Sequence, residues 1–373
     1  MTRAQRPVAN VSVTDPVSYL MPCIADARAR EILARRWRCR IRLTATPTPL
    51  HLLPNFSERL GREVWIKRDD LTGFAAGGNK SRKLELILAD AMNARATSLV
   101  TVGAQQSNHA RTVAAAATAA GIDAHLVLGG SAPEHSSGNL LLDNLFGAEA
   151  HFVDSLDWDA MTEHAHQLCA RLQDQGKRNK RPYFVPAGGS TSLGVLSYAA
   201  AFLELHHQLD LAGQADATIV VASSTGGTQA GLELGAALLG VPANIVGVDV
   251  AQIHSDLGGR VRDLVAATAV DLGFEIPSVD PTVFTDYLGP GYALASNRSQ
   301  EAMTELARDE GIVTDPVYTA KAVAALKDPR LTGPLVFLHT GGVPAMFAEE
   351  AAATYPAVRQ SRKRPLAAAQ NKY

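Results

Sequence analysis

The sequence predicts an α/β protein with mainly parallel sheets, and three observations support this prediction. Seven apolar, mostly β-branched runs of four to six residues have the length of strands that are buried on both faces. Longer helical stretches separate many of these runs. Glycine or proline ends or follows these stretches, as is usual at helix ends. An alternation of this kind builds parallel sheets that are covered by helices.

The elements follow one another along the chain in this order. The predicted strands are Val64–Lys67, Leu99–Val102, Ala124–Leu128, Ala150–Val153, Ala217–Val221, Ile245–Val250 and Leu335–His339. The predicted helices between them include Lys80–Ala91, His109–Ala120 and Thr228–Leu239. Before the first strand, the basic stretch Asp26–Arg40 is also helix-like, and we expect a solvated helix or an arm packed on the body of the protein.

Composition and charge exclude several classes of protein. The chain has 373 residues, with 35 Lys and Arg against 37 Asp and Glu. A nucleic-acid binder would show a basic excess, so none is expected. There is no apolar run long enough for a membrane span and no apolar core of a secretion signal near the first residue. Three widely spaced cysteines offer no disulfide framework and no metal-ligand spacing, so we expect a cytoplasmic enzyme without a metal.

The segment Ala222–Gly231 (ASSTGGTQAG) is a Ser-, Thr- and Gly-rich turn between a predicted strand and a predicted helix. Such a turn directs several backbone N–H groups and the positive end of the helix at one spot, where a phosphate fits. It lacks the lysine of a P-loop and the G-x-G-x-x-G pattern of a dinucleotide-binding turn. A tight turn whose glycines serve only backbone geometry is the alternative.

The segment Gly77–Lys83 (GGNKSRK) places Lys80 at the start of an apolar-faced helix. The positive field of a helix start and partial desolvation disfavour an ammonium group, which makes the amine available as a nucleophile. Lys67 and Lys83 lie nearby in the sequence, and most lysines are solvated surface charges. Composition alone therefore does not choose among the three.

The segment Gly103–His109 (GAQQSNH) brings Gln, Ser and Asn side chains to another helix start. Hydroxyl and amide groups at the positive end of a helix suit the binding of a carboxylate or a phenolate oxygen. Read in isolation, Ser107 or Asn108 is a simple N-cap. A single histidine such as His109 is more often structural than catalytic.

Together, these motifs resemble those of pyridoxal-phosphate enzymes with the tryptophan synthase β-like fold, also called fold type II. Within that fold the chain resembles the branch that holds 1-aminocyclopropane-1-carboxylate (ACC) deaminase and D-cysteine desulfhydrase. The resemblance runs from about Thr46 to about Ala348 and includes WIKRDDLTGFAAGGNKSRKLE, GAQQSNH, VPAGGSTSLGVLSY, STGGTQAG, GPGYAL, EGIVTDPVYTAKA and HTGGVPAMFA. It implies two open, twisted, mostly parallel sheets flanked by helices, and pyridoxal 5'-phosphate as the cofactor.

The resemblance also implies which residues bind the cofactor. Lys80 would bond to it covalently, Asn79 would orient Lys80, and Asn108 would hydrogen-bond the phenolate oxygen of the ring. The phosphate would be held by backbone N–H groups of a single turn, namely those of Thr225, Gly226, Gly227 and Thr228. Thr319 and Thr340 would complete the cofactor site.

A second set of residues would serve the substrate, an amino acid. Ser107 would meet the substrate carboxylate and relay protons, next to Gln106, Asn108 and His109. Tyr292 and Tyr318 would flank the substrate as phenols that protonate or steer a leaving group. The catalytic residues implied by the resemblance are therefore Lys80, Ser107, Tyr292 and Tyr318.

Two positions bear on the substrate. ACC deaminases resemble this chain but have glutamate and leucine where it has Thr319 and Thr340. A carboxylate near the pyridine nitrogen favours the protonated ring, the strong electron sink that ring opening needs, whereas hydroxyls leave the nitrogen neutral. A neutral ring suffices for α,β-elimination, so we expect D-cysteine to be converted to pyruvate, sulfide and ammonia. L-Cysteate sulfo-lyase, ACC deaminase, and a lyase or synthase for another amino acid are the alternatives.

Two other classes of protein fit the residues less well. A dinucleotide-binding oxidoreductase would need G-x-G-x-x-G in its first strand–helix unit, which this chain lacks. A cofactor carrier without catalysis would lack the tyrosines and the serine on the substrate side, which this chain keeps.

The resemblance finally implies how the chain is organised. Residues 93–195 would form a small domain inserted into a large cofactor-binding domain built from residues 46–92 and 196–373. Residues 1–45 would be an N-terminal extension outside the family pattern. The cofactor would lie in the cleft between the domains, closure of the small domain would exclude water, and a homodimer is expected.

Overall fold

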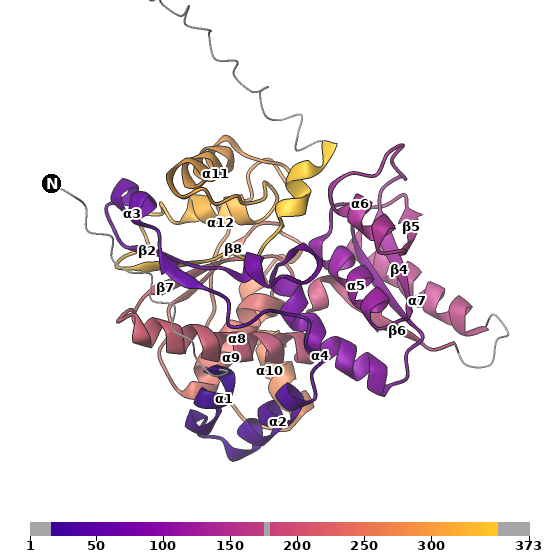
Figure 1. The fold of residues 1–373 in the computed structure, drawn as a ribbon, viewed down its shortest axis with the longest axis horizontal. Coiled ribbons are helices and arrows are strands. Elements are labelled where there is room, and N and C mark those ends of the chain that lie inside the picture. The colour runs from indigo at the N-terminus through magenta and orange to yellow at the C-terminus, as the bar shows by residue number, and fades with distance from the viewer. Residues whose placement is uncertain (1–15, 175–179, 350–373) are drawn as a thin grey trace, which may run out of the picture.

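Two separate β-sheets organise the chain (Figure 1). The computed structural model describes residues 16–174 and 180–349. The larger sheet has six strands in the order β1-β2-β10-β7-β8-β9, and the smaller sheet has four strands in the order β5-β4-β3-β6. Neighbouring strands are parallel except β1, which pairs antiparallel with β2. The predicted α/β class with two mostly parallel sheets is confirmed.

The seven predicted strands all form, each within two residues of its predicted ends. They are β2 (Val64–Lys67), β3 (Ser98–Ala104), β4 (Asp123–Gly129), β5 (Glu149–Val153), β7 (Thr218–Ser223), β8 (Ile245–Asp249) and β10 (Leu335–Leu338). Three further strands were not predicted, namely β1 (Leu50–Leu52), β6 (Pro182–Val185) and β9 (Thr282–Phe284). All three lie at sheet edges, where strands are short and tolerate proline, so their sequences carry a weaker pattern.

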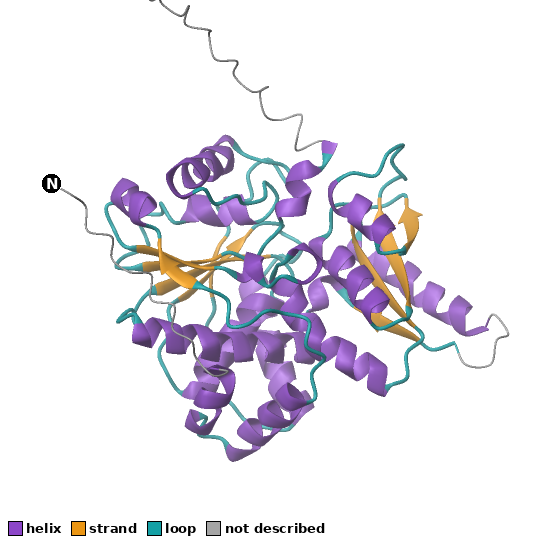
Figure 2. Cartoon of the chain, in the orientation of Figure 1, coloured by secondary structure: helices purple, strands orange, loops and turns teal. Residues whose placement is uncertain are grey.

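The predicted helices also form, and they cover both faces of each sheet (Figure 2). The α-helices are α1 (Pro16–Leu20), α2 (Ala27–Arg38), α3 (Pro54–Leu60), α4 (Asn79–Asn93), α5 (Asn108–Ala119), α6 (Gly138–Leu145), α7 (Trp158–Asp174), α8 (Ser192–Leu211), α9 (Gly227–Leu239), α10 (Leu257–Leu272), α11 (Asn297–Glu310) and α12 (Thr319–Ala325). Short 3-10 helices are η1 (Met21–Cys23), η2 (Asp69–Leu71), η3 (Phe74–Ala76), η4 (Ala187–Gly189) and η5 (Val343–Phe347).

Apolar side chains fill the space between each sheet and its helices. Helices α8 and α9 pack on one face of the larger sheet, while α3, α11 and α12 pack on the other. Helix α5 covers one face of the smaller sheet together with the later turns of α4, and α7 covers the opposite face. All four strands of the smaller sheet lie within residues 93–195. This placement agrees with the predicted inserted domain, whose boundaries stay a prediction.

The N-terminal helices α1 and α2 pack on the body of the protein. Ile32, Leu33 and Trp37 of α2 are buried in one apolar cluster with residues of α8, α9 and α10. The arginines of α2 are at least partly exposed, and one of them, Arg36, pairs with Asp90 of α4 (3.4 Å). The expectation of a helix packed on the body of the protein with a solvated side is therefore confirmed. Among the described residues, no helix has the length and apolar composition to cross a membrane.

This packing predicts that α2 contributes to the stability of the whole protein. Replacing the fully buried Leu33 with alanine should lower the free energy of unfolding by about 2–5 kcal/mol, because it leaves a cavity in the cluster. Leu145 of α6 is 71% exposed, so Leu145→Ala should change it by less than about 0.5 kcal/mol. Denaturant unfolding of both variants tests this, and equal midpoints would show that α2 is not part of the folded core.

Candidate active site

A cleft lies where the carboxyl ends of strands from both sheets meet the starts of α4, α5 and α9. Its empty volume, which includes space open to solvent, is about 740 Å³. Nearly all predicted site residues line it: Asn79, Lys80, Ser107, Asn108, His109, Thr225, Gly226, Gly227, Thr228, Tyr292, Tyr318 and Thr340. Gln106 and Thr319 are the predicted residues that do not. Ligands of α/β proteins gather at this edge of a parallel sheet.

Lys80 is held at the start of α4 by bonds to two other segments. The N–H of Asn79 donates to the carbonyl oxygen of Thr340 (3.0 Å), and the side-chain amide of Asn79 donates to the hydroxyl of Thr228 (3.0 Å). The ammonium of Lys80 donates to Oδ1 of Asn79 (3.1 Å). Burial and the nearby Arg111 lower the pKa of Lys80 to about 8, although Asp315 opposes them. Lys80 therefore has a much larger neutral fraction near neutral pH than an ordinary lysine.

The fold separates the three lysines that the sequence left open. Lys67 is buried away from the cleft, where its ammonium contacts Glu204. Lys83 donates to the carbonyl oxygen of Gly188 (3.0 Å), and its Nζ would lie 3.0 Å from a Cβ added at Gly227. Lys83 therefore sits beneath the glycine-rich turn, and its pKa is lowered well below the usual range by burial and by Lys80. Of the three, Lys80 alone lines the cleft.

The turn before α9 forms a narrow anion cradle. Gly226 has a left-handed backbone (φ 80°) and provides no side-chain cap, so the first N–H groups of α9 keep their donor capacity. A Cβ at Gly227 would clash with Oγ of Ser190, whose hydroxyl also bonds that of Thr225 (2.7 Å). With the amino group of Lys83 beneath it, the turn has the N–H donors and the shape that a phosphate group needs.

The turn before α5 combines helix capping with exposure to the cleft. Oγ of Ser107 accepts the N–H of Ala110 (3.1 Å), so Ser107 is the N-cap and also lines the cleft. Oδ1 of Asn108 accepts a hydrogen bond from the amide of Asn139 (3.0 Å), which leaves the NH₂ group of Asn108 as a donor. Gln106 lies behind, where its Oε1 accepts the N–H of Asn139 (2.8 Å). Gln106 therefore positions Asn139, which in turn orients Asn108.

The imidazole of His109, in the first turn of α5, is neutral at neutral pH. Burial is the main reason that its pKa lies well below the usual range, and the charges of Lys80 and Lys83 add to the effect. A neutral imidazole adds no positive charge beside Lys80.

Two tyrosines from distant segments meet in the cleft. The hydroxyls of Tyr292 and Tyr318 lie 2.6 Å apart, and Trp158 packs edge-on against Tyr292. Burial raises the pKa of both phenols, for Tyr318 well above its usual range. Both hydroxyls are therefore protonated at neutral pH, and the pair holds protons that it can donate.

Asp315 also lines the cleft, although it was not among the site residues predicted from the sequence. Its carboxylate accepts the N–H groups of Tyr318 (2.7 Å) and Thr319 (3.1 Å) and the hydroxyl of Thr319 (2.5 Å). A carboxylate four residues before a helix start, as in DPVYTAK, was the signal that could have identified it. Thr319 is fully buried, and its hydroxyl donates a hydrogen bond to Asp315. Its contact with the cofactor ring therefore stays a prediction.

These features fit pyridoxal phosphate. The cradle before α9 suits the phosphate, the amide of Asn108 suits a phenolate oxygen, and Lys80 offers an amine of lowered pKa. The fold and the cleft together define a pyridoxal-phosphate enzyme.

Comparison with known proteins agrees with this class. Residues 41–341 match the model of the family described as pyridoxal-phosphate dependent enzyme, and the chain belongs to this family. Over 320 residues it is 42% identical to a D-cysteine desulfhydrase of Klebsiella pneumoniae (strain 342), covering 83% of this chain and 95% of that protein. The cofactor of this chain is pyridoxal phosphate, as the resemblance implied.

Solved structures show the same architecture. An ACC deaminase homologue superposes with a TM-score of 0.78 at 36% identity, covering 86% of this chain and 97% of that chain. A fungal L-serine ammonia-lyase from Rhizomucor miehei superposes with a TM-score of 0.59 at 19% identity, covering 84% of this chain and 99% of that one. The latter likeness concerns the fold alone.

The cradle predicts how a single methyl group affects the cofactor. Gly227→Ala should weaken retention of pyridoxal phosphate at least about tenfold, or about 1.4 kcal/mol, because the Cβ would crowd Ser190 and Lys83. Gly258→Ala is the matched control, since its Cβ would meet nothing closer than 3.5 Å. Cofactor titration followed by absorbance measures both, and unchanged affinity of the Gly227 variant would place the phosphate elsewhere.

Proposed function

We propose that this enzyme eliminates the β substituent of a small amino acid and that its substrate is D-cysteine. The observation that carries the proposal is one cleft that holds a lysine of lowered pKa together with a pair of protonated phenols. Such a cleft can accept a proton from Cα and donate one to a leaving group. The similarity to a D-cysteine desulfhydrase over 95% of that protein's length supports the choice of substrate.

The binding step uses the start of α5. Ser107 and the positive end of the helix attract the carboxylate of the amino acid. Asn108, oriented by Asn139, would hold the phenolate oxygen of the cofactor, and Lys83 and the turn before α9 would hold its phosphate. These contacts fix the ring and the substrate in one relative orientation, which is how the protein contributes to cofactor chemistry.

The proton transfers use Lys80 and the tyrosine pair. When bound, pyridoxal phosphate supplies the electron sink that makes the Cα–H bond acidic. Nζ of Lys80, displaced from the cofactor by the amino group of the substrate, would accept the Cα proton, and the Cβ–S bond would break with its electron pair going to sulfur. The hydroxyl of Tyr292 or Tyr318 protonates the departing thiolate, and the two phenols share the remaining proton. Addition of one water balances the reaction, so that D-cysteine gives pyruvate, hydrogen sulfide and ammonia.

Residues Thr319 and Thr340 favour elimination over ring opening of ACC. Thr340 lines the cleft with a hydroxyl, and Thr319 gives its hydroxyl to Asp315. L-Cysteate, which would lose sulfite, is the second candidate because its sulfonate occupies the same β position. We also propose that residues 93–195 close over the cleft as a small domain, and that the enzyme is a cytoplasmic homodimer.

A substrate panel tests the proposed reaction. Pyruvate release should be fastest from D-cysteine among D-cysteine, L-cysteine, β-chloro-D-alanine and L-cysteate. ACC should remain unchanged, because its cyclopropane carries no leaving group on the β carbon. The release of pyruvate, sulfide and sulfite by the holoenzyme measures these rates.

Tyr318→Phe provides the matched control within the same panel. Removing this hydroxyl should slow elimination from D-cysteine more than from β-chloro-D-alanine, since chloride leaves without a proton. Consumption of ACC faster than release of pyruvate from any β-substituted alanine would overturn the proposed reaction. If pyruvate were released fastest from L-cysteate, the proposed elimination would stand, and L-cysteate would replace D-cysteine as the proposed substrate.

A further inference from the structure

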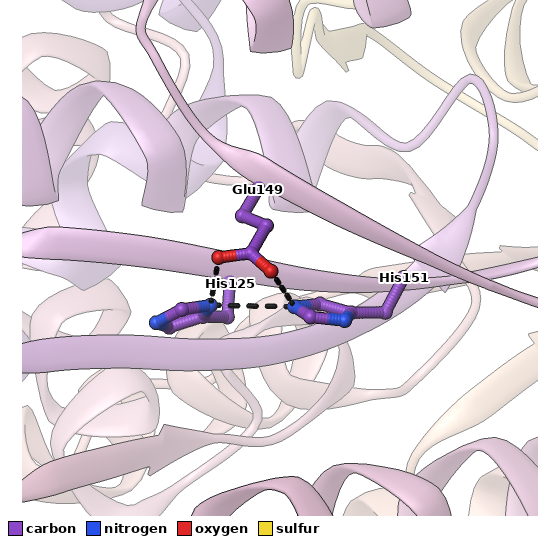
Figure 3. A group of neighbouring side chains, drawn as sticks. All are labelled: His125, Glu149 and His151. Carbon is purple, nitrogen blue, oxygen red and sulfur yellow. Dashed lines mark hydrogen bonds and ion pairs between the residues drawn. The ribbon is translucent and has the colours of Figure 1, made fainter. Parts of the chain in front are cut away.

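Three potential metal ligands meet on the smaller sheet (Figure 3), and none of them lines the cleft. His125 lies on β4, and Glu149 and His151 lie on the neighbouring edge strand β5. His125 is the register partner of Glu149, and residue 151 is two positions further along the same strand. Alternate residues of a strand point to the same face, so the pairing of β4 with β5 brings all three side chains together.

The spacing of the three groups matches a metal site. Nδ1 of His125 lies 3.3 Å from Nε2 of His151 and 3.3 Å from Oε2 of Glu149. Nε2 of His151 lies 3.5 Å from Oε1 of Glu149. Ligands placed 2.0–2.2 Å from a tetrahedral zinc ion stand about 3.3–3.5 Å from one another. The two ring nitrogens therefore already stand at the distance of two corners of such a site, and each lies within 3.5 Å of a different oxygen of the Glu149 carboxylate.

A cation accounts for this convergence better than hydrogen bonds alone. If both ring nitrogens carry protons toward the carboxylate, two N–H groups face each other. If one nitrogen is bare, the N–H of the other ring can donate to it (3.3 Å), but that proton is then not directed at the carboxylate. A divalent ion accepts all three lone pairs at once.

The surroundings leave the site accessible. The side chain of Glu149 is 65% exposed, so an ion can enter and water can fill its fourth position. Lys180, a cation that acts on His125, is neutralised by Asp123 at 2.8 Å. Helix α7 contributes His164 and Arg171 to the electrostatic environment of His151.

We propose that His125, Glu149 and His151 bind one divalent transition-metal ion of the zinc class. Imidazole and carboxylate ligands in this number suit zinc, and two histidines with one glutamate are an established ligand set for it. The ion would join β4 to the edge strand β5 and so stabilise the smaller sheet. The sequence showed no sign of this site. Its three ligands come from two strands and meet only through the register of β4 with β5.

Zinc titration of the tag-free holoenzyme tests the proposal. Isothermal calorimetry without substrate should give one equivalent of Zn²⁺ per chain, and Zn²⁺ should raise the melting temperature. His151→Ala should weaken this binding at least about tenfold and abolish the thermal shift. His135→Ala, in the exposed segment between β4 and α6, should change neither the Zn²⁺ affinity nor the thermal shift.

Two further measurements distinguish the loss of a metal ligand from damage to the fold. Glu149→Gln retains both rings and most of the side-chain shape, and it should also weaken Zn²⁺ binding. Bound Co²⁺ should show the intense visible bands of tetrahedral coordination in the wild type and lose them in both ligand variants. Absence of a bound equivalent in the wild type, or equal affinity in the His151 and His135 variants, would overturn the proposal. Unchanged cofactor absorbance in each variant shows that the fold is intact.

Discussion

A buried ionic network beside the cleft fixes the helix that carries Lys80. Arg82, in the first turns of α4, pairs with Asp69 and with Glu204, each at 2.8 Å. Glu204 also contacts Lys67, and although burial opposes it, these two cations lower the pKa of Glu204 to about 2. Removing one partner of such a network leaves an uncompensated buried charge, which is strongly destabilising. The network therefore ties α4 rigidly to β2 and α8.

The position of α4 makes the cleft a meeting place for distant parts of the chain. Its first residue, Asn79, bonds the segment after β10 and the first turn of α9, while its later turns pack against α5 and the smaller sheet. Lys80 thus stands between the phosphate cradle and the turn that holds Ser107. Because each contact comes from a different sheet or loop, small movements of one sheet against the other change the distances around Lys80.

Much of the fold could be predicted from the sequence, since β-branched runs and strand–helix alternation report local structure directly. The edge strands β1, β6 and β9 could not, because short strands with proline or few apolar residues lack that pattern. Composition alone did not choose Lys80 over Lys67 and Lys83, and the choice came from the family resemblance. The fold gives the physical reason, because Lys67 and Lys83 are fully buried among other partners and only Lys80 lines the cleft. The cluster on β4 and β5 likewise depends on contacts that residue spacing does not specify.

Borohydride reduction of the holoenzyme, followed by peptide mapping, tests the central claim most directly. Reduction makes the bond between the cofactor and its lysine permanent, so the modified residue can be identified by mass. The geometry of the cleft predicts a pyridoxyl group on Lys80 and on no other lysine of the chain. A pyridoxyl group on Lys83 or Lys67, or a protein that carries none after reduction, would contradict the assignment of the base and of the cleft.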